Sequence, residues 1–170
     1  MNKPAFEALV DRHSAELFAY LFRLTRQAAD AEDCLQEAYL RAYRAYGRLP
    51  ADANVRAWLY RIATNTAFSH LRRRRREAGW QAEADERRPA AGPTPSEHAE
   101  QRALRAALAA AVERLPAQQR AALVLRQYQA LSYSEVAEAL ACSPEAARAN
   151  VYQALKKLRE EFRHVTQTEI

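Results

Sequence analysis

Five consecutive arginines, Arg72 to Arg76, form the densest run of charge in the chain. Five guanidinium groups on one helix project around most of its circumference, so they cannot all pair with carboxylates of the same protein. Such a run is suited to neutralising the phosphate backbone of a nucleic acid, with release of counterions. It also fits a solvated last turn of a helix, where cations complement the helix dipole, and the two interpretations are compatible.

The helix expected upstream of these arginines carries side chains that could read unpaired bases. Trp58 and Tyr60 can stack on bases. Asn65 and Ser69 can bond to base edges, and Arg61 lies between the two pairs. Taken alone, the two aromatic residues are more typical of a protein core, so a structural role is the alternative for them. Together with the arginines, the pattern favours a reader of single-stranded nucleic acid.

A second nucleic-acid motif lies near the end of the chain. Residues 133–159 predict two helices joined by a short turn, in which the small Ala137 lets the helices cross closely. The outer face of the second helix presents polar and basic side chains that can enter the major groove or reach phosphates. These are Arg148, Asn150, Tyr152, Gln153, Lys156 and Lys157. A generic helical hairpin could show the same spacing, but the polar face favours DNA binding.

An acidic cluster opens the second expected helix of the chain. It comprises Asp30, Glu32, Asp33, Gln36 and Glu37. DNA would repel this face, so we expect it to contact a protein surface of positive charge. The helix dipole is an alternative explanation for carboxylates in the first turn, but it explains Gln36 and Glu37 less well.

No catalytic or metal-binding constellation is visible in the sequence. The four histidines are scattered and lack zinc-ligand spacing. With three glycines, the chain has neither type of phosphate-binding glycine loop, and it has no nucleophile elbow. We therefore expect a protein with no enzymatic activity, no cofactor and no metal.

Length and composition define the scaffold that must position these groups. The chain has 170 residues, of which 49% are hydrophobic and 28% charged, with a net charge of +5, as is typical of a globular protein. Because glycine is scarce, the tight turns of an all-β fold are not available, and we predict an all-α fold. The two distant cysteines, Cys34 and Cys142, indicate the cytoplasm. No apolar run or signal-like N-terminus is present, so no membrane insertion is expected.

Charge and proline content divide the chain into three parts. Residues 1–76 carry a net charge of +6, residues 77–100 carry −4, and residues 101–170 carry +3. The middle part holds three of the seven prolines and few large apolar side chains, so it is predicted to be a flexible acidic linker. We place one small helical domain at residues 1–76 and the other at residues 101–165.

Residues that favour helix starts give local expectations. Asp30 is predicted to be the N-cap of the second helix, and the third helix is predicted to start near Asn54. In the second domain, Ser132 is expected to cap a short helix. Ser143 followed by Pro144 is expected to open the last helix.

Two groups of motifs resemble the bacterial RNA polymerase sigma factors of the sigma-70 family. Residues 33–39 (DCLQEAY), residues 56–65 (RAWLYRIATN) and the following arginine run are similar to region 2 of that family. Residues 115–120 (LPAQQR) and 131–137 (LSYSEVA) are similar to region 4. A chain of two domains without the intervening region 3 resembles the extracytoplasmic-function (ECF) group. The similarity covers nearly all of residues 5–163.

The resemblance implies a non-catalytic transcription initiation factor that binds core RNA polymerase, directs it to specific promoters and assists promoter melting. The implied partners are promoter DNA, core polymerase (through its β′ clamp helices and its β subunit) and an anti-sigma factor. Three residues match family positions that dock on the β′ clamp helices: Asp33, Gln36 and Glu37.

The resemblance and the residue chemistry together give candidate promoter contacts in both domains. Contacts with the −10 element are expected from Leu49, Asp52, Asn54, Trp58, Arg61, Asn65, Ser69, Arg72, Arg73 and Arg74. Contacts with the −35 element are expected from Arg126, Tyr133, Ser134, Arg148, Asn150, Tyr152, Gln153, Lys156 and Lys157. The loop from Leu49 to Asn54 corresponds to the place where the family captures a flipped base. The acidic linker resembles the segment that the family threads through the polymerase near the RNA exit path.

Several positions depart from the family pattern. Ala141 and Ala130 stand where the family has glycine, and alanine needs no left-handed conformation if the turn is built differently. Ala149 and Gln153 stand where serine and arginine are common, which removes one hydroxyl and one guanidinium from the −35 surface.

Two other classes of protein fit parts of the pattern. A repressor or activator with this helix-turn-helix would bind DNA by itself, usually as a dimer. It would not need the acidic face at Asp33, Gln36 and Glu37. A helical adaptor with an incidental arginine run would bind nucleic acid without sequence specificity. Transcription by purified core polymerase distinguishes the three classes.

Overall fold

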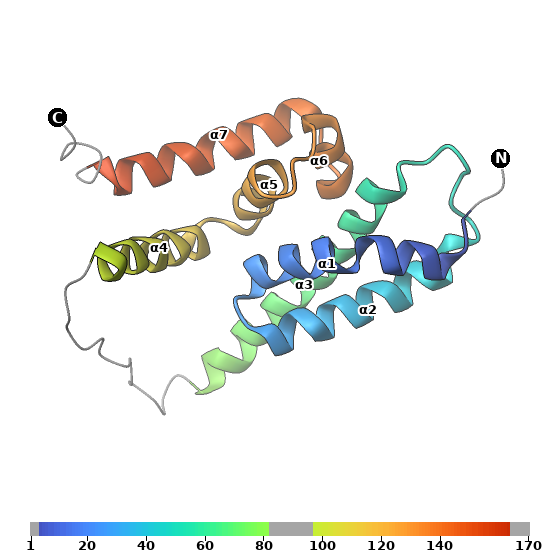
Figure 1. Ribbon diagram of the computed structural model, residues 1–170, viewed down its shortest axis with the longest axis horizontal. Helices are drawn as coiled ribbons and strands as arrows, with labels where there is room; N and C mark the ends of the chain where they lie inside the picture. Colours follow the sequence, from blue (N-terminus) through green and yellow to red (C-terminus); the bar gives the residue numbers. More distant parts are fainter. Residues whose placement is uncertain (1–3, 82–96, 164–170) are drawn as a thin grey trace.

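The computed structural model of the chain describes residues 4–81 and 97–163. Regular secondary structure in this part is helical throughout, which confirms the predicted all-α fold class (Figure 1). The helices are α1 (Phe6–Thr25), α2 (Ala28–Tyr46), α3 (Val55–Gln81), α4 (Glu97–Arg114), α5 (Ala117–Gln127), α6 (Tyr133–Leu140) and α7 (Pro144–Glu161). Of the predicted linker, residues 82–96 lie outside the described residues, and α3 and α4 extend into its two ends.

Helices α1, α2 and α3 form a bundle because each has an apolar face. On α1, Leu17, Leu21 and Leu24 recur at three- and four-residue steps and are almost fully buried. Helix α2 buries small side chains instead, including Ala38 and Ala42. Because these side chains are short, the backbone of α2 packs closely against α1 and α3.

Helix α2 begins earlier than predicted, so the assignment of Asp30 as its N-cap is wrong. Gln27 is the N-cap residue and makes no side-chain capping bond. Asp30 lies inside the first turn, where its carboxylate pairs with Arg74 and lies 3.2 Å from Nε2 of His70. Asp30 therefore connects the start of α2 to α3, and this tertiary contact replaces a capping role.

The other predicted helix starts are confirmed. Asn54 Oδ1 accepts a hydrogen bond from the backbone amide three residues later, at 3.0 Å, immediately before α3. Ser132 and Glu135 form a reciprocal capping box at the start of α6. Ser143 accepts from the amide three residues later, and Pro144 occupies the first position of α7.

Two turns of the second domain contain an alanine in the left-handed conformation. Ala130 follows α5 with a φ of 55°, and Ala141 separates α6 from α7 with a φ of 52°. These turns are therefore not built in the different way that would let alanine avoid the left-handed conformation. The amide of Cys142 donates to the carbonyl of Ala137 at 3.0 Å, so the turn has the form that glycine usually adopts. In alanine this conformation crowds the Cβ atom against the backbone.

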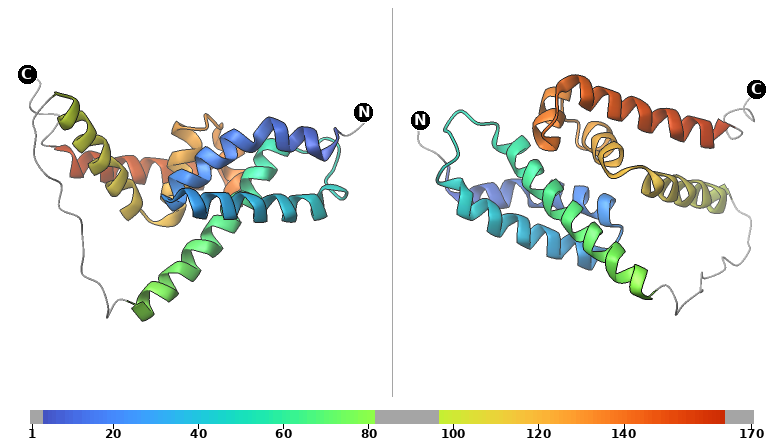
Figure 2. Two further views of the ribbon diagram at one scale, coloured as in Figure 1. Left: turned by 60° about the horizontal axis from the view of Figure 1, so that its bottom comes forward. Right: turned by 180° about the vertical axis from the view of Figure 1, so that it is seen from behind.

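The first three helices and the last four pack against each other (Figures 1 and 2). Helix α6 lies against α3, and α5 lies against α1. Buried residues of both groups form one continuous cluster, in which Leu59 and Ala63 of α3 join Val136 and Leu140 of α6. We refer to this packing as the closed arrangement. It brings the helix with the −10 candidates against the first helix of the helix-turn-helix.

Candidate protein and nucleic-acid interfaces

The acidic candidates on α2 share one exposed face. Asp33, Gln36 and Glu37 follow at three- and four-residue spacing and are all exposed, whereas the opposite face of α2 is buried in the bundle. Glu37 pairs with Arg41 on the solvent side. Four residues after Gln36, the side chain of Leu40 is 59% exposed. The face therefore combines negative charge with an exposed apolar side chain at its C-terminal end, a composition suited to contact with another protein.

Sequence reasoning did not single out Leu40. A signal was available, because Leu40 lies out of phase with the buried residues Cys34, Ala38 and Ala42 of the same helix. A leucine on the polar face of an amphipathic helix indicates a contact outside the bundle.

Three −10 candidates form a straight stripe along α3. Arg61, Asn65 and Ser69 are four residues apart and all exposed. The stripe continues into the arginine run, where the Arg72 side chain donates to the Ser69 hydroxyl at 3.3 Å. Arg73 lies 3.2 Å from a ring nitrogen of His70. The whole run stays exposed, and Arg74 is paired with Asp30. Most of the charge of the run is therefore available to phosphates even in the closed arrangement.

The two aromatic residues of α3 have different environments. Trp58 is half-buried, with its ring centroid 6.3 Å from that of Tyr46. Tyr60 is fully buried, and its ring makes an edge contact with Tyr20 at 5.2 Å between centroids. Tyr60 is therefore a core residue, which was the alternative for it from the sequence, and it cannot stack on a base in the closed arrangement.

The loop between α2 and α3 reaches the second domain. Leu49 is half-buried, while Asp52 and Asn54 are exposed. Asn54 Nδ2 donates to Glu135 Oε1 of α6 at 3.1 Å. The side-chain amide of Asn54, a candidate contact with the −10 element, is thus bonded to Glu135, which follows the −35 candidates Tyr133 and Ser134 in the sequence.

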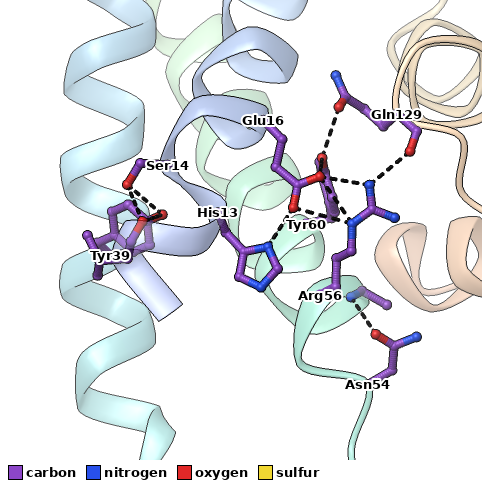
Figure 3. Close-up of polar contacts among 10 residues, drawn as sticks. His13, Ser14, Glu16, Tyr39, Asn54, Arg56, Tyr60 and Gln129 are labelled. Atoms are coloured by element: carbon purple, nitrogen blue, oxygen red, sulfur yellow. Dashed lines mark hydrogen bonds and ion pairs between the residues drawn. The ribbon is translucent and has the colours of Figure 1, made fainter. Parts of the chain in front are cut away.

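A polar network crosses the contact between the two helical groups (Figure 3). Arg56 of α3 donates to both carboxylate oxygens of Glu16 on α1 and, at 2.9 Å, to the backbone carbonyl of Gln129. The Tyr60 hydroxyl lies 3.0 Å from Glu16 Oε2 and 3.0 Å from Gln129 Oε1. His13 Nδ1 lies 2.5 Å from the same carboxylate. Residues of the first domain therefore hold the side chain and the backbone of one residue of the second.

The network controls the ionisation of its members. Burial by itself would raise the pKa of Glu16, but hydrogen bonds from Arg56, His13 and Tyr60 outweigh burial and hold that pKa below its ordinary value. The hydrogen bond to Glu16 raises the pKa of Arg56. Burial, followed by the charge of Glu16, raises the pKa of Tyr60. At neutral pH the network is therefore an ion pair bonded to a neutral phenol.

Three −35 candidates from three helices meet around one ring. The guanidinium carbons of Arg126 (α5) and Arg148 (α7) lie 4.7 Å and 5.0 Å from the ring centroid of Tyr133 (α6). The Arg126 side chain also donates to the carbonyl of Leu131 at 2.8 Å. Two cations stacked on one aromatic ring form a rigid, basic surface at the start of the helix-turn-helix.

Most of the remaining −35 candidates lie along the second helix of that motif. On α7, Arg148, Tyr152, Gln153, Lys156 and Lys157 are exposed, and Asn150 is half-buried. Ser134, which lies on α6, is exposed as well. The Tyr152 side chain is 59% exposed, which is unusual for a large ring without an external contact. Val151 and Ala154 on the opposite face are buried. Helix α7 therefore presents its polar face outward, as a recognition helix requires.

The two cysteines differ from reactive thiols. Cys34 is buried, and burial, followed by the charges of Asp30 and Glu37, raises its pKa to about 11. Cys142 is half-buried, and burial raises its pKa as well.

In the part of the chain that the structure describes, no group of three or more potential metal ligands occurs. Within residues 4–81 and 97–163, no helix combines the length and hydropathy that a membrane crossing requires.

Comparison with known proteins matches both domains. The family described as "Sigma-70 region 2" matches residues 9–77, and that described as "Sigma-70, region 4" matches residues 105–158. The chain is 34% identical over 161 residues to the RNA polymerase sigma-H factor of Pseudomonas aeruginosa, covering 90% of this chain and 83% of that protein. It is 30% identical over 172 residues to the ECF RNA polymerase sigma-E factor of Escherichia coli K12, covering 90% and 84%.

A solved structure shows the same fold. The sigma factor RpoE of Bartonella quintana, crystallised in complex with the anti-sigma factor NepR, matches this chain with a TM-score of 0.70. The match covers 91% of this chain and 94% of that one, at 24% sequence identity.

Proposed function

This chain belongs to the ECF group of the sigma-70 family, and from that premise we propose how its two domains divide the work of transcription initiation. It is an RNA polymerase sigma factor: a non-enzymatic subunit that binds RNA polymerase and directs transcription initiation. In our proposal, residues 1–76 bind core polymerase and the −10 element, and residues 101–165 bind the −35 element. The segment 77–100 links them.

The acidic face of α2 docks on the β′ clamp helices of core polymerase. Its exposed carboxylates attract a basic partner, and the 59% exposed Leu40 adds an apolar anchor one turn after Gln36 and Glu37. A protein that acted on DNA alone would gain nothing from this face, which argues against a free-standing repressor or activator.

The stripe of Arg61, Asn65 and Ser69 reads the melted −10 element. The observation that carries this part of the proposal is that the stripe is exposed and runs directly into five exposed arginines. The stripe supplies groups for base edges, and the arginines supply charge for phosphates. Capture of an unstacked base in the loop from Leu49 to Asn54 offsets part of the cost of melting, which is about a few kcal/mol.

The cluster of Arg126, Tyr133 and Arg148 and the exposed face of α7 bind the −35 duplex. Two guanidinium groups held by one ring are fixed in orientation, which suits them to phosphate or base-edge contacts. Lys156 and Lys157, two turns further along α7, supply charge for the backbone.

Promoter binding requires the closed arrangement to open. Asn54 is bonded to Glu135, and Tyr60 is buried against the second domain. The loop between α2 and α3 and the start of α6 therefore contact each other and are not free to contact DNA. The 15 residues between the end of α3 at Gln81 and the start of α4 at Glu97 can span up to roughly 50 Å when extended, more than the roughly 34–36 Å of one duplex turn. The linker therefore permits the separation.

An anti-sigma factor and the β subunit of the polymerase complete the proposed partners, and the cytoplasm is the proposed location. The complex of the Bartonella quintana sigma factor with NepR supports the first of these, because that protein shares the fold. The apolar groove lined by Leu104, Leu108, Leu123 and Phe162 is a surface of the second domain suited to either partner.

Charge reversal on α2 tests the polymerase interface. We expect the variant D33K/E37K to lose co-purification with core polymerase, because it changes an acidic face into a basic one. The matched control E7K/D11K makes the same change in net charge at two exposed positions of α1. Unchanged core binding by D33K/E37K, or equal losses in both variants, would contradict the assigned interface.

A further inference from the structure

A cavity of about 310 Å³ lies where the ends of α1 and α3 meet α4 and α5. Four arginines line it, Arg26, Arg74, Arg75 and Arg120, and the acidic lining residue is Glu113. A volume of this size is at the lower end of the range for small-ligand sites. The surplus of positive charge indicates an anionic ligand.

Two of the four guanidinium groups already have carboxylate partners. Arg26 Nε donates to Glu113 Oε1 at 2.9 Å, and Arg74 pairs with Asp30. Arg75 and Arg120 form no ion pair within the described residues. The uncompensated charge of the cavity is therefore concentrated on these two side chains, one from each domain.

Arg120 is the more unusual of the pair. Its side chain is 5% exposed and donates to backbone carbonyls, at 3.1 Å to Leu24 and at 3.4 Å to Leu115, while its Nε atom has no hydrogen-bond partner. Burial, followed by the neighbouring charge of Arg75, lowers the pKa of Arg120. The charge of Glu113 opposes this effect only in part. A buried cation that forms no ion pair is unfavourable, and an anion beside Arg120 supplies both a counter-charge and a partner for the unused donor.

We propose that this cavity binds a small phosphate-type anion, such as pyrophosphate or the polyphosphate group of a nucleotide, between Arg75 and Arg120. Planar guanidinium groups bind phosphate oxygens through paired hydrogen bonds. Because Arg75 lies on α3 and Arg120 on α5, the anion bridges the two domains. It binds the closed arrangement in preference to the open one, and so shifts the population toward the closed form by mass action.

A nucleic-acid backbone offers the same phosphate chemistry, but the cavity favours a compact anion. Residues of α4 and α5 in the second domain line one side of the cavity, and residues of α1 and α3 in the first domain line the other. This combination of walls exists only while the domains are packed together, whereas promoter binding requires them to separate. Free pyrophosphate and a short oligonucleotide therefore serve as the two arms of the test.

Calorimetric titration of the full chain with pyrophosphate, at constant ionic strength, measures the site directly. Arg75→Gln removes one of the two unpaired cations at an exposed position, and we expect it to weaken pyrophosphate binding about tenfold. Arg76→Gln is the matched control, because Arg76 is exposed on the next position of α3 and does not line the cavity. This control should bind pyrophosphate like the unmodified chain.

Three results would overturn the proposal. The first is no measurable pyrophosphate binding by the unmodified chain. The second is an equal loss in Arg75→Gln and Arg76→Gln, which indicates attraction to the arginine run as a whole. The third is that Arg75→Gln weakens the binding of an oligothymidine of eight nucleotides but leaves pyrophosphate binding unchanged. A rise in thermal midpoint with pyrophosphate that Arg75→Gln diminishes and Arg76→Gln preserves supports the proposal.

Discussion

Removing the Gln129 side chain is expected to loosen the closed arrangement by a calculable amount. The single proton of the Tyr60 hydroxyl is shared between Glu16 Oε2 and Gln129 Oε1, each at 3.0 Å. In Gln129→Ala this proton is donated to Glu16 alone, so no buried donor is left without a partner. The backbone bond from Arg56 is also retained. The loss is therefore one share of a hydrogen bond, about 0.5–1 kcal/mol. This corresponds to about a two- to fivefold shift of the equilibrium toward the open form.

Energy transfer between one dye on α2 and one dye on α7 measures that equilibrium. Gln127→Ala is the control, because Gln127 is exposed two residues earlier in the chain. Tyr60→Phe completes a double-mutant cycle, since it removes the hydroxyl and keeps the buried ring. We expect a coupling of about 0.5–1 kcal/mol between the two substitutions. Fully additive effects, or an unchanged distribution in Gln129→Ala, would refute the role of this bond in holding the domains together.

Three further expectations follow from the geometry. Ala141→Gly should stabilise the chain by about 0.5–1 kcal/mol in urea unfolding, because it relieves a left-handed alanine at φ 52°; a destabilised variant would contradict this. The pKa of Glu16 lies below its ordinary value of 4.5 in the folded chain, so its stabilising contribution is present above pH 4.5 and is lost as the pH falls through the lower, folded-state pKa. The unmodified chain should therefore lose stability more steeply below pH 4.5 than Glu16→Gln does, and parallel curves would be the contrary result. Arg148→Ala should weaken binding to a −35 duplex by about 1–3 kcal/mol in fluorescence anisotropy, and unchanged affinity would remove Arg148 from that surface.

Local features of this fold were predictable because their causes lie within a few residues. Ser132 and Ser143 precede helices α6 and α7 and cap them as expected, since a cap bonds to the amide three residues later. The buried leucines of α1 recur at three- and four-residue spacing, which is a local property of the sequence. Asp30 shows where local reasoning ends, because its carboxylate pairs with side chains of α3 rather than capping its own helix.

The conformation of the turn at Ala141 also depends on tertiary packing. Alanine rarely adopts positive φ, so the residue type favoured another turn, but the packing of α6 and α7 imposes the left-handed form. Tertiary packing outweighs a local preference of about 1–2 kcal/mol.

The exposed surfaces were easier to anticipate than the contact between the domains. The stripe on α3 and the acidic face on α2 follow from helical periodicity. The network of Glu16, Arg56 and Gln129 joins residues far apart in the chain, and no spacing rule connects them. The same holds for Arg120, whose burial against α1 depends on how the two domains meet.

The most direct measurement of the central claim is start-site mapping of transcripts made by purified core RNA polymerase, with and without this chain, on a library of genomic promoters. If one domain holds the polymerase and both hold the promoter, the chain should produce transcripts from defined start sites that core polymerase alone does not make. An identical set of transcripts in both reactions, with no association between the chain and core polymerase, would contradict the claim.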